Sequence, residues 1–153
     1  MLRLLLATNP ACADTPLHAA SATGQLHVVK WLLRESGLTF PVQLPDDVEQ
    51  TGRYPIHSAA KNGDLKAVRF WITEQKVDVD IADANGWTPL FWAAAGGHGN
   101  LVIALLYDLG AEPQKLSNAS ENAADVARAN GHQAIADCIR TFVTVRRESY
   151  CCR

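Results

Sequence analysis

The chain has 153 residues, of which 48% are hydrophobic and 20% are charged, the composition of an ordinary soluble globular domain. Its formal net charge of −2 gives no electrostatic reason to expect nucleic acid or an anionic membrane as a partner. No apolar run approaches the roughly 18 residues that a membrane-spanning helix needs. Composition therefore predicts one soluble domain that binds neither nucleic acid nor membrane.

The four cysteines do not form the pattern of a disulfide framework or of a zinc site. Cys12 is isolated, Cys138 lies in a helical pattern, and Cys151 and Cys152 precede Arg153 without any CxxC pair. We therefore expect a reduced intracellular compartment, cytoplasmic or nuclear, and no metal or other cofactor. Cys151-Cys152 is either a lipidation site or, as we favour, part of a frayed reduced tail, since it forms no CaaX box.

Residues 1–13 open with a short apolar segment, LRLLLA. This segment is too short for the apolar core of a signal peptide. We predict a single short helix, which would cover the first of the repeated segments described next.

Four segments of the chain share one pattern, in which a proline or an alanine precedes a glycine by eight residues. The pairs are Pro16 and Gly24, Pro55 and Gly63, Pro89 and Gly97, and Ala123 and Gly131. The four glycines are 39, 34 and 34 residues apart, by subtraction of their numbers. Such self-similarity is typical of a protein built from stacked repeats.

The third segment shows why these residues should form a pair of helices. Asn85-Gly86 is a strong turn signal, because both residues tolerate positive φ. Thr88 suits a helix N-cap and Pro89 suits the first helical position. A short run of small residues then ends at Gly96-Gly97. The apolar positions of the second helix are Leu101, Val102, Leu105 and Leu106.

The other segments repeat the apolar spacing of a second helix. Its residues are Leu26, Val28, Val29, Leu32 and Leu33 in the first segment, Leu65, Val68, Phe70, Trp71 and Ile72 in the second, and Ile135, Cys138, Ile139 and Phe142 in the fourth. One such helix pair cannot bury its apolar face alone, so we expect the pairs to stack. We expect Trp31, Phe70 and Trp71 to lie in the core.

With a T-P-L-H-x-A core and a period near 33 residues, these segments resemble the ankyrin repeat. The resemblance covers about residues 14–141 and implies an all-α solenoid of stacked helix-turn-helix units with hairpin-like loops. We predict one domain, with an N-terminal cap at 1–13, repeats at 14–48, 49–82 and 83–116, a degenerate capping repeat at 117–145 and a tail at 146–153. The last helix is expected to end near Val145, with a solvated outer face at Asp137, Arg140, Thr141 and Thr144.

The connection after Glu35 carries about five more residues than its counterparts, which is the difference between the spacings of 39 and 34. Apolar residues occupy every second position from Leu38 to Leu44, but Pro41 and Pro45 argue against a paired central strand. We predict a long extended finger. Because long loops are often functional, Phe40 within it is a candidate for partner contact.

The histidines of the repeats invite a metal or catalytic interpretation, which we consider the weaker one. The resemblance implies that His18 and His57, at equivalent positions, are structural imidazoles that bond across repeats. His98 and His132, which follow glycines, are also expected to be structural. The sequence contains no GxSxG, P-loop, GxGxxG or HExxH motif, so we do not expect an enzyme.

In ankyrin proteins the hairpin tips and the short first helices line a concave binding face, and the resemblance implies the same role for matching positions here. An exposed Trp87 beside Arg53 would have the composition of a binding hot spot, although Trp87 could instead fold onto its own hairpin. The candidate partner-binding residues are Gln50, Thr51, Arg53, Lys61, Asn62, Asn85, Trp87, Trp92, Glu121 and, from the long loop, Phe40.

The sequence therefore predicts a monomeric protein–protein interaction module that acts as an adaptor or as a stoichiometric inhibitor. Two alternatives stay open: a regulatory piece of a larger enzyme or complex, and a structural spacer without a dedicated partner. A pocket with convergent polar groups would favour the first alternative. Mutation of Trp87 and Arg53 without loss of any interaction would favour the second.

Overall fold

The computed structural model describes residues 20–21, 23–36 and 52–151. The predicted N-terminal cap, most of the long loop, and His18 lie outside these residues. The helices are α3 (Leu26–Ser36), α4 (Pro55–Lys61), α5 (Leu65–Thr73), α6 (Pro89–Ala95), α7 (Gly99–Ile103), the π-helix η1 (Ala104–Asp108), α8 (Ala123–Ala129) and α9 (Gln133–Cys151). No strand occurs in this part of the chain.

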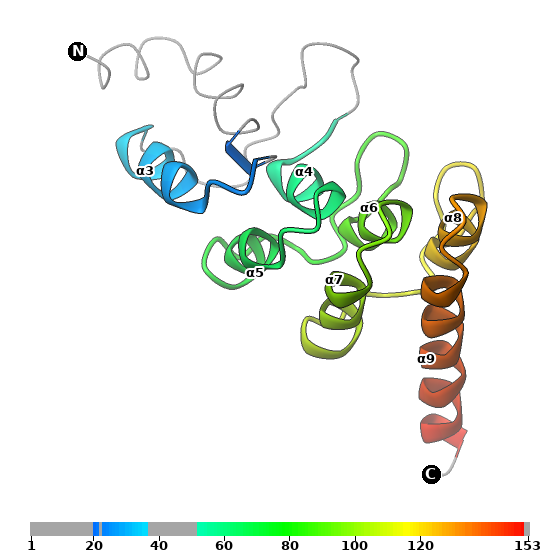
Figure 1. Ribbon diagram of the computed structural model, residues 1–153. Coiled ribbons are helices and arrows are strands. Elements are labelled where there is room, and N and C mark those ends of the chain that lie inside the picture. The colour runs from blue at the N-terminus through cyan, green and yellow to red at the C-terminus, as the bar shows by residue number, and fades with distance from the viewer. Residues whose placement is uncertain (1–19, 22, 37–51, 152–153) are drawn as a thin grey trace.

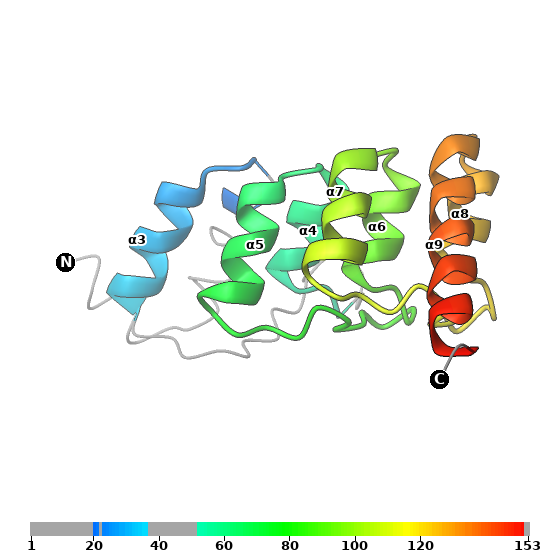
Figure 2. The same cartoon turned by 90° about the horizontal axis from the view of Figure 1, so that it is seen from below.

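The helices form two layers of a stack (Figures 1 and 2). The short helices α4, α6 and α8 contact one another in sequence and form one layer, while α3, α5, α7 and α9 form the other. Small side chains let the short helices pack closely, and those that are buried include Ala59, Ala60, Ala93, Ala94 and Ala127. The prediction of an all-α solenoid of stacked helix pairs is thus confirmed.

The first helices begin where the prolines predicted, with Pro55 in α4 and Pro89 in α6. Thr88 takes the extended N-cap conformation, but its buried hydroxyl caps nothing and has no hydrogen-bond partner, so the expected side-chain cap is absent there. True side-chain caps occur elsewhere. The Asp64 carboxylate accepts from two backbone N–H groups at the start of α5, and the Asn122 amide oxygen accepts from one in α8.

The turn after each first helix is shaped by a glycine with positive φ, and the next repeat packs against it. Gly63 and Gly97 have φ of 74° and 78°, which glycine adopts without a Cβ clash. The residue after each such glycine lies over the glycine of the preceding repeat, in the pairs Asp64 on Gly24, His98 on Gly63, and His132 on Gly97. These contacts give the histidines the structural role predicted for them.

His57 links the second repeat to the loop that follows it. Its Nδ1 accepts a hydrogen bond from the backbone N–H of Tyr54 at 3.0 Å, so the ring proton is on Nε2. Nε2 then donates to the carbonyl oxygen of Ile81 at 2.9 Å. The side chain is buried. Both nitrogens are therefore occupied in holding the backbone, which confirms the structural interpretation of this histidine.

The layer of second helices is joined on its outer side by ion pairs between repeats. Lys30 Nζ lies 3.1 Å from a Glu74 carboxylate oxygen, which connects α3 with α5. Arg69 pairs with Asp108, which connects α5 with η1. Because these side chains are about half exposed, each pair contributes about 1 kcal/mol or less to stability.

Three details of the second helices differ from the prediction. The Trp31 side chain, expected in the core, is 47% exposed, whereas Phe70 and Trp71 are buried as predicted. The second helix of the third repeat widens into a π-helix, η1, after Ile103. The last helix does not end near Val145 but continues to Cys151, so the backbone from residue 146 to 151 is helical rather than frayed.

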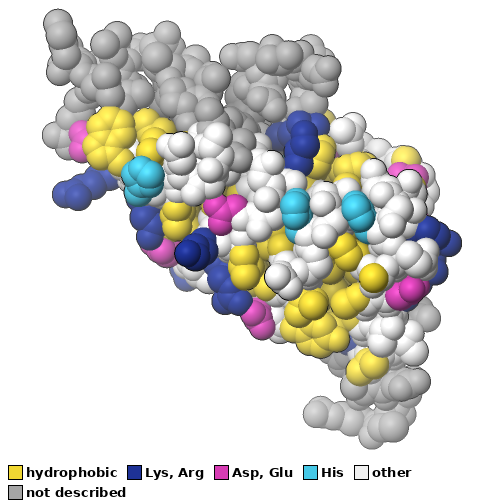
Figure 3. Space-filling model, viewed as in Figure 1, with side chains coloured by type: hydrophobic (Ala, Val, Ile, Leu, Met, Phe, Trp, Pro, Cys, Tyr) yellow, Lys and Arg dark blue, Asp and Glu magenta, His cyan; other side chains and the backbone are white. Residues whose placement is uncertain are grey.

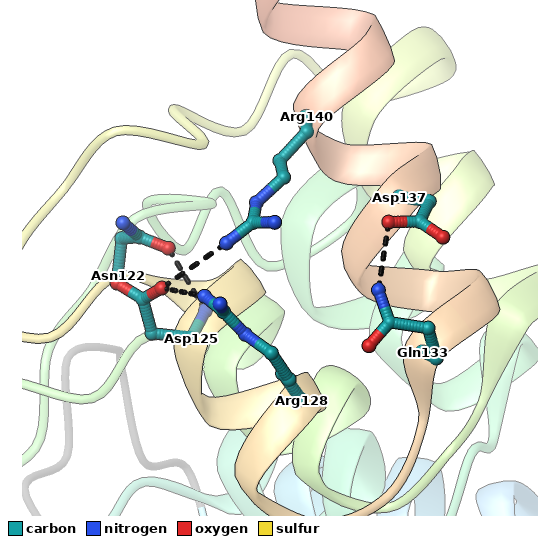
Figure 4. A network of polar contacts seen from close by, with 6 residues as sticks. All are labelled: Asn122, Asp125, Arg128, Gln133, Asp137 and Arg140. Carbon is teal, nitrogen blue, oxygen red and sulfur yellow. Dashed lines mark hydrogen bonds and ion pairs between the residues drawn. The ribbon is translucent and has the colours of Figure 1, made fainter.

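The outer face of the last repeat carries a polar network in place of an apolar contact (Figure 4). With a repeat of 34 residues, Arg140 corresponds to Leu106 and Asp125 to Phe91, both of which are buried between repeats. Here Asp125 instead pairs with Arg128 and, at 3.6 Å, with Arg140. The predicted solvated positions are all exposed, namely Asp137, Arg140, Thr141 and Thr144.

Candidate protein-binding surface

The hairpin before α6 is organised by one buried carboxylate, that of Asp83. Its Oδ1 accepts hydrogen bonds from the backbone N–H groups of Asn85 and Trp87, each at 2.9 Å. Its Oδ2 accepts from the indole Nε1–H of Trp92 at 3.1 Å. Three donors thus compensate the buried charge. The same carboxylate fixes the shape of the hairpin and the orientation of the Trp92 ring.

Trp87 is held against its own repeat. Its ring centroid lies 4.8 Å from that of Trp92 and 6.0 Å from that of Phe91, at the separations of favourable aromatic contacts. The side chain is half-buried, so it is less exposed than the sequence suggested. The expectation of a freely projecting Trp87 is therefore corrected: the residue folds partly onto its hairpin and keeps an exposed portion.

Two cations from the second repeat meet Trp92 of the third. The guanidinium carbon of Arg53 lies 4.2 Å from the centroid of the Trp92 ring, and Lys61 Nζ lies 5.8 Å from it. A cation over an aromatic face is attracted by the ring quadrupole. Trp92 is 9% exposed, so it supports this surface more than it offers contact area. We call Arg53, Lys61, Trp87 and Trp92 the cation–tryptophan surface.

Lys30 and Arg69 of the second helices have acidic partners, whereas Arg53 and Lys61 have none among the described residues. Within the residues that the structure describes, no carboxylate lies within 4.0 Å of the Arg53 guanidinium or of Lys61 Nζ. The Nε–H of Arg53 is also buried without a hydrogen-bond acceptor there. Figure 3 shows basic atoms beside hydrophobic ones over α4. The positive charge of this surface is thus not compensated by the described part of the chain.

The hairpins of the third and fourth repeats are joined through Asn118. Its backbone N–H donates to the carbonyl of Asn85 at 3.0 Å, and its side-chain amide donates to the carbonyl of Ala84 at 2.8 Å. Asn85 is exposed beside this joint, and Glu121 is exposed on the next hairpin. The hairpin row therefore forms one continuous edge next to the cation–tryptophan surface.

The remaining candidates fall into two groups. Asn62 is exposed at the C-cap of α4, but its amide donates to the carbonyl oxygen of Ser58 at 3.1 Å. Phe40, Gln50 and Thr51 lie outside the described residues. Asp83 was missed by sequence reasoning, although an aspartate two residues before Asn85-Gly86 is a signal for side-chain hydrogen bonding within a turn.

The described residues contain no group of three or more His, Cys, Asp or Glu side chains placed to hold a metal ion. A pocket of about 380 Å³ lies beside α9, and Arg140 is the only ionisable residue among those that line it. None of the described helices combines the length and the apolar character that crossing a membrane requires.

Sequence comparison places this geometry among known repeats. A family profile described as ankyrin repeats in three copies matches residues 38–117, and the single ankyrin repeat profile matches residues 12–43. Together they cover the described helices from α3 to η1.

Several curated proteins are similar to this chain. The probable 26S proteasome regulatory subunit p28 of Saccharomyces cerevisiae is 36% identical over 74% of this chain and 47% of its own length. The calmodulin-binding transcription activator 3 of Arabidopsis thaliana is 36% identical over 64% of this chain and 10% of its own. The human transient receptor potential cation channel subfamily A member 1 is 33% identical over 60% of this chain and 8% of its own length. The chain thus spans less than half the length of these relatives.

Proposed function

Because this chain belongs to the ankyrin repeat family, we propose that it binds a partner protein through the cation–tryptophan surface and the adjoining hairpin edge. Ankyrin repeats are protein–protein interaction modules and are typically non-catalytic. The observation that carries the proposal is the cation–π contact between the guanidinium carbon of Arg53 and the Trp92 ring, 4.2 Å from its centroid, because it joins two repeats into one surface. Tryptophan and arginine are the residues most enriched at binding hot spots.

The contact area available to a partner comes from Trp87 and its neighbours. Trp87 is half-buried, so one part of its ring is fixed by Phe91 and Trp92 while another part is free for contact. A ring that is already fixed loses little conformational entropy on binding. Asn85 and Glu121 extend the contact along the hairpins with polar groups, as in the rim of an interface.

We place the protein in the cytoplasm or nucleus, as a monomeric and non-catalytic adaptor or stoichiometric inhibitor that does not require nucleic acid. The similarity to a proteasome regulatory subunit supports an adaptor within a multi-subunit assembly. The outer face of the last repeat supports a monomeric state, since Asp125, Arg128 and Arg140 satisfy one another there.

The experiment is quantitative affinity purification with matched tryptophan variants. The native chain, Trp87→Ala and Trp31→Ala are compared as baits. Trp31 is a suitable control because it is 47% exposed on α3, in the other layer. We expect at least one protein to be recovered by the native chain and by Trp31→Ala but not by folded Trp87→Ala. Equal recovery with all three baits would reject the proposed surface.

A further inference from the structure

We infer that the segment recognised at the cation–tryptophan surface is an acidic peptide, with Asp or Glu side chains beside an apolar residue. This inference rests on the proposed function, because it specifies the chemistry of the partner at the same surface. Its basis is the combination of two cations, Arg53 and Lys61, that have no acidic partner among the described residues, with the partly exposed ring of Trp87 beside them.

The position of Arg53 is suited to binding a carboxylate. Stacking of its guanidinium on Trp92 at 4.2 Å restricts the side chain, so less freedom is lost when a ligand binds. The five N–H donors of a guanidinium match the two oxygens of a carboxylate in a bidentate pair. Because the Arg53 side chain is only partly exposed, such a pair would be less screened by water than one on the open surface.

Within the described residues, the two acidic side chains of these hairpins, Asp83 and Glu121, form no ion pair with Arg53 or Lys61. The Asp83 carboxylate accepts three hydrogen bonds, from Asn85, Trp87 and Trp92, and so belongs to the hairpin. Glu121 lies on the next hairpin, where its backbone N–H bonds to the Ser117 hydroxyl. A bound acidic peptide therefore gains attraction from Arg53 and Lys61, while Glu121 limits how far its acidic residues extend along the hairpin edge.

A protein ligand fits these observations better than nucleic acid. Nucleic-acid binding uses several cations along a track, because each phosphate contact adds to the affinity. Here two cations flank one aromatic pair, and the chain as a whole carries a net charge of −2. Peptide carboxylates with an adjacent apolar side chain match both the charge and the Trp87 ring.

A displayed library of random 12-residue peptides tests the inference directly. Peptides that bind the immobilised native chain are passed over immobilised Trp87→Ala, which removes those that do not need Trp87. The peptides that remain are sequenced. We expect Asp and Glu to be enriched over the unselected library, with an apolar residue nearby. Enrichment of basic or uncharged sequences, or the absence of any enriched sequence, would overturn the inference.

The enriched consensus peptide is then synthesised with a fluorescent label and its affinity is measured by fluorescence anisotropy. We expect Arg53→Gln and Lys61→Gln each to weaken binding by about fivefold or more, and a rise in salt from about 0.05 to 0.5 M to weaken it comparably. Lys66→Gln is the matched control, since Lys66 is exposed on α5 and its loss changes the net charge equally. That variant should stay within about twofold of the native chain.

The outcomes separate this inference from the proposed function. Peptides that need Trp87 but are insensitive to Arg53, Lys61 and salt would overturn the acidic ligand and leave the surface in place. If the depletion step removes every peptide that binds the native chain, so that all binders also bind Trp87→Ala, both the inference and the proposed function are rejected. The same anisotropy measurement is made with a labelled 12-nucleotide DNA. Binding of this DNA that depends on Arg53 and is tighter than that of the peptide would overturn the inference in favour of a nucleic-acid ligand.

Discussion

The guanidinium of Arg53 stacks on the ring of Trp92, a residue 39 positions later in the chain that belongs to the next repeat. Trp92 is in turn held by the hydrogen bond from its indole N–H to Asp83. A buried carboxylate of one hairpin therefore orients an aromatic ring that positions a cation of the preceding repeat. This chain of contacts connects the local structure of a turn with the charge on the proposed binding surface.

Replacement of Trp87 should affect stability as well as binding. Trp87→Ala removes the contacts with Phe91 and Trp92, so we expect the free energy of unfolding to fall by about 1–3 kcal/mol, more than a surface substitution costs. Urea denaturation followed by circular dichroism measures this change. A loss below about 0.5 kcal/mol would mean that the ring is not held against its own repeat in solution.

His57→Phe should destabilise the stack even though phenylalanine, Phe91, occupies the same register in the third repeat. The substitution leaves the Tyr54 N–H and the Ile81 carbonyl without their partner, and we expect a loss of about 2 kcal/mol. The control is His27→Phe, at an exposed position of α3, which should change stability by about 0.5 kcal/mol or less. Equal melting temperatures of the two variants would refute the bridging role of His57.

A pair of glycine variants isolates the contact between repeats. Gly97 and Gly131 occupy equivalent turns, with φ of 78° and 84°. A Cβ on Gly97 would approach the His132 ring to 2.7 Å, whereas a Cβ on Gly131 would meet nothing within 4 Å. Both alanine variants incur the backbone strain of about 1–2 kcal/mol, so Gly97→Ala should be the less stable of the two. Thermal melting that ranks them in the opposite order would contradict this packing.

These glycines also show what the sequence alone can predict. Proline and glycine set local φ, so the starts of α4 and α6 and the turns after them could be predicted from single positions. The Arg53–Trp92 contact joins residues of different repeats, and no local preference encodes it. The exposure of Trp31 was misjudged for a related reason, because helical spacing does not say how far a neighbouring repeat covers a helix face.

The stability of the stack should depend on pH through Asp80, which lies at the end of the second repeat and accepts hydrogen bonds from the Glu112 N–H of the third. Burial raises the pKa of this carboxyl above its ordinary value of 3.8, while the Glu112 N–H and Lys115 oppose the shift. The folded protein then holds this proton more tightly than the unfolded chain does. The contribution of Asp80 to stability is therefore greatest in acid and is lost as the pH rises through the folded-state pKa.

Asp80→Asn removes this titration and serves as the reference. We expect the free energy of unfolding of the native chain, relative to that of the variant, to decrease as the pH rises from about 3 to 7. Urea denaturation at constant ionic strength measures this difference at each pH. A difference that increases with pH would show that the hydrogen bond from Glu112 and the charge of Lys115 outweigh burial, contrary to this account.

The central claim, that a partner protein binds at the cation–tryptophan surface, can be tested with the four tryptophans of the chain as internal probes. A ¹⁵N–¹H spectrum resolves their indole N–H signals before and after addition of a protein recovered by affinity purification. Trp87 and Trp92 belong to the surface, whereas Trp31 lies on α3 and Trp71 is buried in α5. The account predicts that the signals of Trp87 and Trp92 shift while those of Trp31 and Trp71 stay unchanged. A shift confined to Trp31, with Trp87 and Trp92 unaffected, would contradict it.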